Sequence, residues 1–389
     1  MSTAQPAPVD TLETFDWDTF LDRYWDRRPV LIRGHGFDPA PFDGHEVFEG
    51  AVAAATRAPA GRVTFTVGSR RLTDPGDLLP QPEDASFSAY QRRVTEQLAG
   101  APFALVVREL HARHHPLWLR ERDFVAALWD RAGQPLLGAT TTLHYGTCGS
   151  DRPAHTRGAT FLYTLLGRPR LRLDPGGPAE RAAEVPPGDL LYWPPGHRYA
   201  AEPGTTPGAV VHLGVPRHPP RPGDALCRLL APGPNPVSPQ GGWGGDDILV
   251  PDEANTTALP AELPRVLAEG LAQYRAAGRP APMERWLARE SLRHATDGGL
   301  RPVPPPARPG YFTDDDGIRA VERVLWSEAA GRRLVAACGH VMETDLTAPE
   351  LASVVGLLNA GTTVTVGELV PSARTLVSRL AGFRAVERL

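Results

Sequence analysis

Residues 144–212 decide the fold, with HYGTCGSDRPAHTRGATFLYTLLGRPRLRL at 144–173 and VPPGDLLYWPPGHRYAAEP at 185–203. Short runs rich in β-branched and aromatic residues alternate there with Gly/Pro turns, which is typical of many short antiparallel strands. Four of the chain's twelve histidines lie in or beside these runs: His144, His155, His197 and His212. The stretch therefore predicts a small β-barrel with a polar mouth, inside an α+β fold.

The sequence before this stretch is mostly helical. Residues 12–28 carry aromatic side chains at helical spacing up to Pro29, so we expect a helix whose aromatic face packs on a sheet, followed by a short strand at 30–34. Residues 62–72 read as a β-hairpin. Amphipathic patterns predict three further helices, at 46–58, 86–100 and 116–133.

The sequence after the barrel stretch predicts further elements. Pro and Gly are dense from residue 231 to about 245, which indicates a linker or an ordered surface loop. Helical patterns return at 259–297. In the tail, a helix, a short strand and a second helix are expected in that order at 346–361, 362–369 and 370–383, which suggests a winged-helix-like module. We thus expect three parts: a barrel with N-terminal helices (1–230), a linker with a helical segment (231–300), and the C-terminal module (301–389).

Composition limits the classes of function. With 41% hydrophobic and 22% charged residues, the chain is typical of a globular protein. Its net charge of −4 argues against binding to nucleic acid or to an anionic membrane. All 41 basic residues are arginines, which excludes any mechanism that needs a lysine amine. Three widely separated cysteines, no signal-peptide pattern and no long apolar run predict a cytoplasmic protein. The last predicted helix carries only Arg374 and Arg379, so we expect the tail to have a structural or dimer-supporting role rather than to bind DNA.

The motifs, taken in order, resemble those of the JmjC-domain cupins, and most of all the bacterial ribosomal oxygenases. The resemblance rests on DRYWDRRPVLIRG (22–34), GTCGSDRPAHTRGATFLYTLLGRPRLRL (146–173), PPGDLLYWPPG (186–196), VVHLGVP (210–216) and the tail. It implies a double-stranded β-helix (jelly-roll) barrel, a helical middle segment and a winged-helix-like C-terminal domain. It also implies a protein or peptide substrate, Fe(II) and 2-oxoglutarate as cofactors, and a homodimer formed through helices around 259–297.

The metal site that the resemblance implies is degenerate. Such oxygenases hold iron with a His-x-Asp or His-x-Glu pair and a second histidine, whereas here His155 is followed by Arg157, and Tyr199 stands at the later histidine position. A guanidinium has no lone pair to donate to a metal. His197 could be a displaced ligand or could simply cap a turn. An all-histidine site, formed by His155 and His212 with His144 and His197 as further candidates, is the other alternative. The candidate metal ligands are His155, His197 and His212.

The co-substrate site implied by the resemblance has also changed. Relatives anchor 2-oxoglutarate with a basic residue where this chain has Pro169, in GRPRL, and an expected asparagine is replaced by Thr142. Arg170 or Arg172 could take over, because a guanidinium can bind a carboxylate in bidentate fashion. Asp189 is expected to close the turn before its strand rather than to act as an acid.

Two hypotheses follow from these residues. In the first, the chain is a cupin that binds a protein or peptide with lost or altered Fe(II)/2-oxoglutarate chemistry, in a non-catalytic or accessory role. In the second, it is an active JmjC-type oxygenase that hydroxylates a protein or peptide side chain with a non-standard metal site. The sequence leaves open whether the chain is an enzyme and whether it binds either cofactor. It predicts no nucleic-acid or membrane partner.

Overall fold

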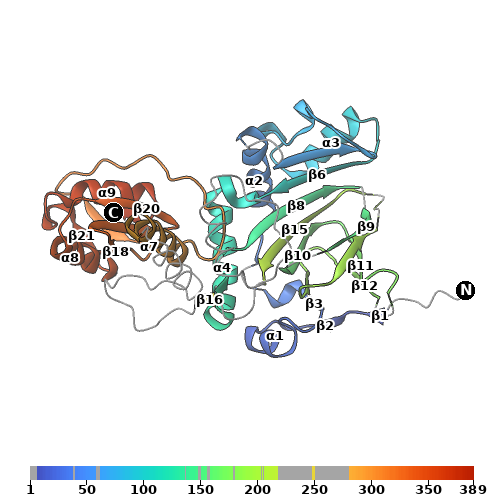
Figure 1. Ribbon diagram of the computed structural model, residues 1–389. Helices are drawn as coiled ribbons and strands as arrows, with labels where there is room; N and C mark the ends of the chain where they lie inside the picture. The colour runs from blue at the N-terminus through green and yellow to red at the C-terminus, as the bar shows by residue number, and fades with distance from the viewer. Residues whose placement is uncertain are drawn as a thin grey trace, which may run out of the picture. The chain divides into compact units, whose positions relative to one another are not determined.

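The computed structural model describes most of the chain and divides it into two compact units (Figure 1). The first unit comprises residues 1–128 and 139–217, and the second comprises 129–138 and 218–389. The described residues are 7–37, 40–57, 62–135, 137–147, 150–155, 158–177, 180–202, 204, 206–217, 248–249 and 280–389. Each unit is considered by itself below.

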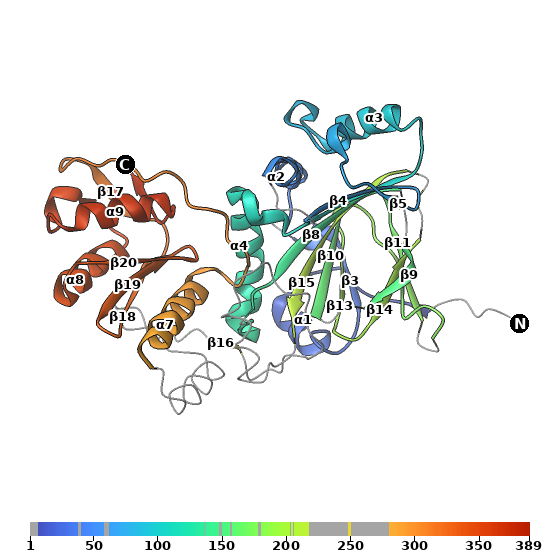
Figure 2. The same cartoon turned by 45° about the horizontal axis from the view of Figure 1, so that its top comes forward.

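Two sheets form the body of the first unit (Figure 2). The larger has nine strands in the order β2-β3-β13-β10-β15-β8-β6-β4-β5. Their bounds are β2 Asp10–Leu12, β3 Val30–Ile32, β4 Val63–Val67, β5 Arg70–Arg71, β6 Phe103–Arg108, β8 Thr140–Gly146, β10 Gly158–Leu166, β13 Leu190–Trp193 and β15 Gly208–Pro216.

The smaller sheet has five strands in the order β1-β12-β11-β14-β9. Their bounds are β1 Ala7–Pro8, β9 Ser150–His155, β11 Arg170–Leu173, β12 Arg181–Glu184 and β14 Arg198–Ala201. One apolar cluster joins the two sheets: Leu162, Leu191 and Trp193 from the larger sheet pack with Leu171 and Leu173 from the smaller. The two sheets therefore face each other across a shared interior.

Along the central strands, side chains alternate strictly between this interior and the core on the outer side of the sheet. In β8 and β15 every second residue is fully buried, and the residues between them are half-buried. The buried set includes Tyr145, whose ring stacks on Phe87, so this face packs under helices. The half-buried set, which includes His144 and His212, faces the smaller sheet. Because side chains alternate between the faces of a strand, the sequence pattern alone places these residues on one surface.

Helices and short 3-10 turns cover the outer face of the larger sheet. They are α1 Trp17–Arg23, α2 Gly44–Arg57, α3 Phe87–Gln97 and α4 His115–Ala132, with η1 Gly34–Gly36, η2 Gly76–Leu78, η3 Pro82–Asp84 and η4 Leu110–Arg113. The helix expected at 12–28 is shorter than its pattern. Asp16 caps α1 by accepting from the Thr19 amide, and residues 10–12 pair with β3 as a strand. Its aromatic residues form core as predicted, with Phe20 4.8 Å from Tyr192 between ring centroids.

Two of the quoted motifs meet at one point of close backbone contact. A Cβ added to Gly34 would lie 2.3 Å from the carbonyl oxygen of Gly188, so only glycine fits there. Asp189 accepts from the Gly34 amide and from Nη1 of Arg33, each at 2.8 Å. This carboxylate therefore closes the turn and ties it to β3, as the sequence predicted. The PPGD motif (186–189) and the pair Arg33–Gly34 are therefore in direct contact.

Gly34→Ala is expected to destabilise the first unit by about 2–3 kcal/mol, because the new methyl group overlaps a backbone carbonyl that cannot move freely. Gly44→Ala is the matched control, since nothing lies within 4 Å of a Cβ at that position. It is expected to change the free energy of unfolding by less than about 1 kcal/mol. Urea denaturation of both variants measures the difference. Equal stability of the two variants would contradict the contact at Gly188.

The second unit combines helices with two small sheets. α7 Pro280–Thr296 precedes the meander β18 Leu325–Ala329, β19 Arg332–Ala337 and β20 His340–Thr344. A second sheet has the order β21-β17-β22, with β17 Gly317–Ala320, β21 Val364–Thr365 and β22 Val386–Arg388. The helices α8 Ala348–Asn359 and α9 Ala373–Gly382 flank η6 Val366–Glu368. Thr347 and Glu350 form a capping box at the start of α8. Both tail helices lie where they were expected, and the strand between them shortens to two residues.

This division differs from the three parts expected from the sequence. Residues 129–138 belong to the second unit, where β7 Gln134–Pro135 pairs with β16 Ile248–Leu249. α7 also belongs to this unit and packs on the meander through Leu292. The segment 231–245 and most of the expected dimer segment 259–297 lie outside the described residues. In the part of the chain that the structure describes, no helix is long and apolar enough to cross a membrane.

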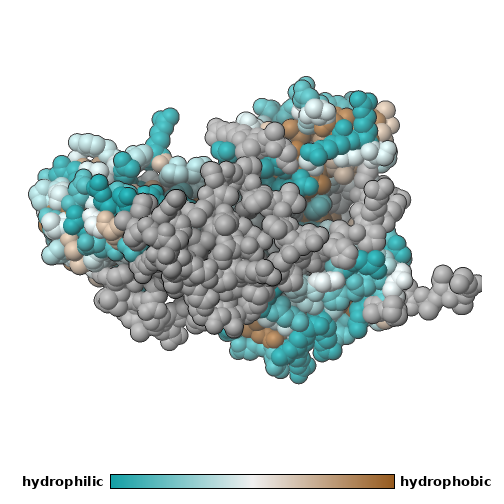
Figure 3. All heavy atoms as spheres, viewed as in Figure 1, coloured by the Kyte–Doolittle hydropathy of each residue, from teal (hydrophilic) through white to brown (hydrophobic). Residues whose placement is uncertain are grey.

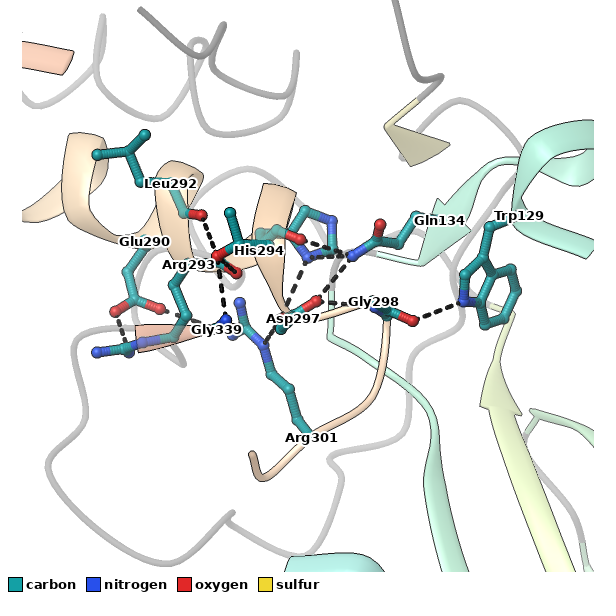
Figure 4. A network of polar contacts seen from close by, with 12 residues as sticks. Trp129, Gln134, Glu290, Leu292, Arg293, His294, Asp297, Gly298, Arg301 and Gly339 are labelled. Carbon is teal, nitrogen blue, oxygen red and sulfur yellow. Dashed lines mark hydrogen bonds and ion pairs between the residues drawn. The ribbon is translucent and has the colours of Figure 1, made fainter. Parts of the chain in front are cut away.

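A buried network of charges holds residues 129–138 to α7 (Figure 4). Asp297 is fully buried and accepts from Nε of Arg301 at 2.7 Å and from Nε2 of Gln134 at 2.8 Å. Gln134 also donates to the carbonyl of His294 at 2.7 Å. Burial alone raises the pKa of Asp297, but the charge of Arg301 and hydrogen bonds from His294 and Arg301 hold that pKa below its usual value. The carboxylate is thus charged and fully engaged.

Candidate functional site

Three neighbouring strands build one polar row on the interior face of the larger sheet. Arg108 of β6 pairs with Thr142 of β8, and Thr142 pairs with His212 of β15. Directly opposite residues in a sheet share a face. His144 lies on the same face, two residues along β8 from Thr142, beside Val106. The register therefore brings a guanidinium, a hydroxyl and two imidazoles onto one surface.

Rings from both sheets surround His212. Its ring centroid lies 4.5 Å from that of His144, 5.6 Å from Tyr199 and 6.1 Å from Trp193. Tyr199 and Trp193 also contact each other at 5.3 Å. We call His144, Trp193, Tyr199 and His212 the interior cluster. Leu162, opposite His212 in β10, adds an apolar wall.

Burial keeps both histidines of the interior cluster neutral. Burial, and secondarily the charge of Arg108, lowers the pKa of His144 to about 4. Burial and the neighbouring His144 lower the pKa of His212 well below its ordinary value. Burial also raises the pKa of the Tyr199 hydroxyl. At neutral pH the cluster therefore presents two neutral imidazoles and a neutral phenol.

His197 lies at the end of the turn between β13 and β14, next to the end of β11. Its Nδ1 is 2.6 Å from a carboxylate oxygen of Asp174, and the same carboxylate accepts from the Arg198 amide at 2.9 Å. Asp174 itself has a positive φ of 51°. These contacts are those of a turn cap. The side-chain partner of His197 described here is thus Asp174, whereas the rings beside His212 are those of His144, Trp193 and Tyr199.

Arg170 and Arg172 lie on the face of β11 that points away from the interior. Leu171 and Leu173, which alternate with them, pack in the shared interior. Arg170 is 3.7 Å from Glu202, and Arg172 is 3.5 Å from Glu180. Of the three candidate co-substrate residues, only Thr142 is on the interior face. Alternation within β11 decides this, because inward leucines force both arginines outward.

His155 is in β9, where its backbone pairs with that of Arg198. Its side chain and the whole of Arg157 lie outside what the structure describes. Among the described residues, no group of three or more His, Cys, Asp or Glu side chains is arranged to hold a metal ion.

The donor groups on the described strand faces of β6, β8 and β15 do not by themselves form the iron site that the resemblance implies. Non-haem iron of this class is held by two histidines and one carboxylate. The described interior-facing residues provide two imidazoles and one phenol, and no Asp or Glu alternates onto these strand faces. In addition, the charge of Arg108 acts on His144 and would repel a metal cation. The described side chains of these three strands therefore supply no anionic ligand for iron.

Two residues of the site were not predicted from the sequence. Arg108 ends the alternating run FALVVR, in which Phe103, Leu105 and Val107 are buried, so its face was readable from alternation. Trp193 follows Tyr192 in the run LLYW, which is buried throughout. A strand buried on both faces has no polar alternation, so only the pairing of Thr160 with Trp193 assigns the tryptophan to the interior.

The chain was compared with known proteins. No protein-family model and no curated protein sequence matches it. Among solved structures, the X-ray structure of E. coli YcfD matches at 16% identity and a TM-score of 0.50, covering 98% of this chain and 100% of that one. The structure described as Escherichia coli ribosomal oxygenase YcfD matches at 17% identity and a TM-score of 0.47, with 98% and 100% coverage.

A further YcfD structure, in complex with cobalt and 2-oxoglutarate, matches at 17% identity and a TM-score of 0.45, covering 97% of this chain and 99% of that one. At these identities the likeness concerns the fold alone. The α+β class with large sheets agrees with the sequence analysis. The resemblance to ribosomal oxygenases is confirmed at that level: the chain has, over its full length, the fold of E. coli YcfD.

Proposed function

We propose that this chain is an oxygenase-like protein that binds a protein or peptide in the interior between its two sheets, with lost or altered iron/2-oxoglutarate chemistry and a non-catalytic or accessory role. The two facing sheets correspond in this proposal to the double-stranded β-helix of the JmjC cupins, and the helices and sheets of 301–389 to a winged-helix-like module. The observation that carries the proposal is the interior cluster. Tyr199 stands where a ligand is implied, with its ring packed on Trp193 and His212.

The exposed surface of the first unit favours binding of the partner in the interior rather than on the surface. In the first unit, no large hydrophobic residue among the described ones is exposed, and the strongly exposed ones, such as Tyr311 and Leu389, belong to the second unit. On the face drawn in Figure 3, most of the described surface is hydrophilic. Flat apolar patches are the usual mark of a protein-binding surface. The proposal therefore places recognition in the interior of this unit rather than at an exposed apolar patch.

The partner to test first is a ribosomal protein or peptide, because YcfD is named a ribosomal oxygenase. A second copy of this chain is the other proposed partner. Light scattering on the purified full chain would show a mass of about two chains if the homodimer forms, and a mass of one chain would contradict it.

Metal and co-substrate binding test the proposal directly. After purification with iron present, the chain is expected to hold less than about a tenth of an equivalent of iron, because Arg157 and Tyr199 stand where the resemblance implies metal ligands. Calorimetry with Co(II) and 2-oxoglutarate is expected to show no binding. E. coli YcfD, for which a complex with cobalt and 2-oxoglutarate is known, is the positive control under the same conditions.

The opposite result supports the alternative function, an active oxygenase that uses His155, His197 or His212. Stoichiometric iron would contradict the non-catalytic proposal. The variants His155→Ala, His197→Ala and His212→Ala would then identify the ligands by loss of iron. His197→Ala separates the two roles considered for that residue, since a turn cap changes stability and leaves metal content unchanged.

A further inference from the structure

The residues that lead into β17, at 306–314, lie along α9 and are held to it at three points; we call them the proline segment. The contacts, made by a backbone amide, a hydroxyl and a surface ion pair in turn, join Ala307 to Gly382, Ser378 to Gly310 and Arg374 to Asp314. The three helix residues are four apart, so they form one stripe of α9, and the segment runs antiparallel to the helix. A Cβ added to Gly382 would lie 3.2 Å from the Ala307 carbonyl oxygen, because the chain approaches the helix closely. The two walls are therefore fixed relative to each other without a ligand.

A groove of about 430 Å³ lies beside these contacts. Pro309, Tyr311 and Phe312 line it from the proline segment, and Thr375 and Arg379 line it from α9. Phe312 is buried, whereas Tyr311 is 81% exposed and is the most exposed large hydrophobic side chain among the described residues. The groove therefore combines a buried aromatic residue with an aromatic ring that only a bound partner would cover.

The charge of the groove is positive. None of its described lining residues is acidic, and two of them, Arg374 and Arg379, are basic. Arg374 is paired with Asp314 at the surface, whereas the guanidinium of Arg379 is exposed and makes no hydrogen bond or ion pair with the described residues. Arg308, exposed on the proline segment, is unpaired in the same sense. The acidic run 314–316 begins at the Arg374 end, so the unpaired charge at the Arg379 end is positive.

Two features of the groove decide which ligand it suits. A guanidinium has five N–H donors and no acceptor, and a carboxylate can accept two parallel hydrogen bonds from it. The side chains of Tyr311 and Pro309 offer apolar contact, which a small free acid would leave exposed to water. In an extended peptide, residues i and i+2 point to the same face about 7 Å apart. A peptide with an acidic and a bulky apolar side chain at that spacing engages Arg379 and Tyr311 together.

From this arrangement we infer that the groove between α9 and the proline segment docks an acidic peptide segment of a partner protein. A carboxylate of the partner binds Arg379, and an apolar side chain of the partner packs against Tyr311. The inference goes beyond the proposed function, which concerns the interior of the first unit, and does not depend on it.

Three matched peptides test the inference on the full chain. The probe is acetyl-Gly-Glu-Gly-Leu-Gly-amide; replacing its glutamate by glutamine removes the charge, and replacing its leucine by alanine removes most of the apolar contact. Fluorine NMR of the chain with 3-fluorotyrosine at its eight tyrosines, with the Tyr311 resonance assigned by Tyr311→Phe, reports contact at the groove. The probe is expected to shift this resonance and to bind at least about fivefold more tightly than either comparison peptide.

Variants separate this groove from general attraction between charges. Arg379→Gln is expected to weaken binding of the probe at least about fivefold and to abolish its preference over the glutamine peptide. Arg332→Gln is the matched control, because Arg332 is also exposed and unpaired among the described residues, and its loss changes the net charge equally. Arg332 lies at one end of β19, whereas His340, beside the turn at the other end, contacts Phe383 of the groove with ring centroids 5.0 Å apart. The control is expected to leave binding unchanged within about twofold.

The outcomes decide the inference in either direction. A shift of the Tyr311 resonance that depends on the glutamate, is lost in Arg379→Gln and is kept in Arg332→Gln supports it. Equal binding of the glutamate and glutamine peptides, or full binding of the probe by Arg379→Gln, overturns it. So does the absence of any shift at millimolar probe. An equal shift produced by sodium acetate would reduce the groove to a contact for small anions and overturn the docking of a peptide.

Discussion

Replacing Asp297 by alanine is expected to lower the free energy of unfolding of the second unit by about 3–5 kcal/mol, the range found when one partner of a buried ion pair is removed. Arg301 would keep its charge in a buried position, and Glu290, 3.6 Å away, would be its one remaining acidic partner among the described residues. The side chain of Gln134 and the Gly299 amide would each lose an acceptor that now lies at 2.8 Å. Asp297→Asn is expected to cost less, since it preserves shape and part of the hydrogen bonding.

Hydrogen exchange during denaturant titration, read by mass spectrometry on peptides of α7, measures this loss within the second unit. The control is Glu343→Gln, because Glu343 pairs with Arg289 at 3.5 Å on the surface and such a pair contributes less than about 1 kcal/mol. Adding Arg301→Met to Asp297→Asn is expected to recover part of the stability, since the unpaired charge is then gone. If Asp297→Ala and Glu343→Gln behave alike, the network is not a stabilising one.

Replacing Glu121 by alanine is expected to cost the first unit a similar amount, about 3–5 kcal/mol. Glu121 and His111 are fully buried, with a carboxylate oxygen of Glu121 2.6 Å from Nδ1 of His111. The Thr141 hydroxyl donates to the same oxygen at 3.2 Å and lies 2.8 Å from Nδ1. The substitution removes a shared acceptor and leaves a cavity between η4, α4 and β8.

Asp123→Asn is the control on the same helix, since Asp123 is 71% exposed and its pair with Arg122 lies at the surface. It is expected to change stability by less than about 0.5 kcal/mol. Glu121→Gln is expected to fall between the two, because its amide keeps an acceptor for His111 but buries an N–H₂ group without a described partner. Exchange in peptides of α4 and β8 reports the loss. An effect of Glu121→Ala no larger than that of Asp123→Asn would show that the buried pair adds nothing.

Local patterns explain why the elements were well predicted. The helices at α2, α3, α4, α8 and α9 and the hairpin β4-β5 follow from periods of 3.6 and 2 that are written in adjacent residues. The exception is α1, which begins at Trp17 and not at residue 12, because residues 10–12 pair with β3, a partner 20 residues away. Pairing between distant segments leaves no trace in local periodicity.

The candidate site was predicted less well for the same reason. Alternation within each strand predicted the faces on which Thr142 and His212 lie. Their position next to each other depends on the register of β8 with β15. The outward direction of Arg170 and Arg172 depends on the leucines between them finding a core in the opposite sheet. His197 was equally compatible with a ligand and a cap until Asp174 was placed beside it.

The sequence by itself determined three things about this chain: its oxygenase-like fold, its lack of lysine, and the presence of Arg157 and Tyr199 where metal ligands are implied. Each of these depends only on the identity and order of the residues. The tertiary structure alone decided which polar groups share the interior. Strand register joined Arg108, Thr142 and His212, sheet-on-sheet packing turned Tyr199 and Trp193 toward them, and burial made both imidazoles neutral. Charge and proximity in a folded chain are set by contacts between distant residues, and those exist only once the two sheets face each other.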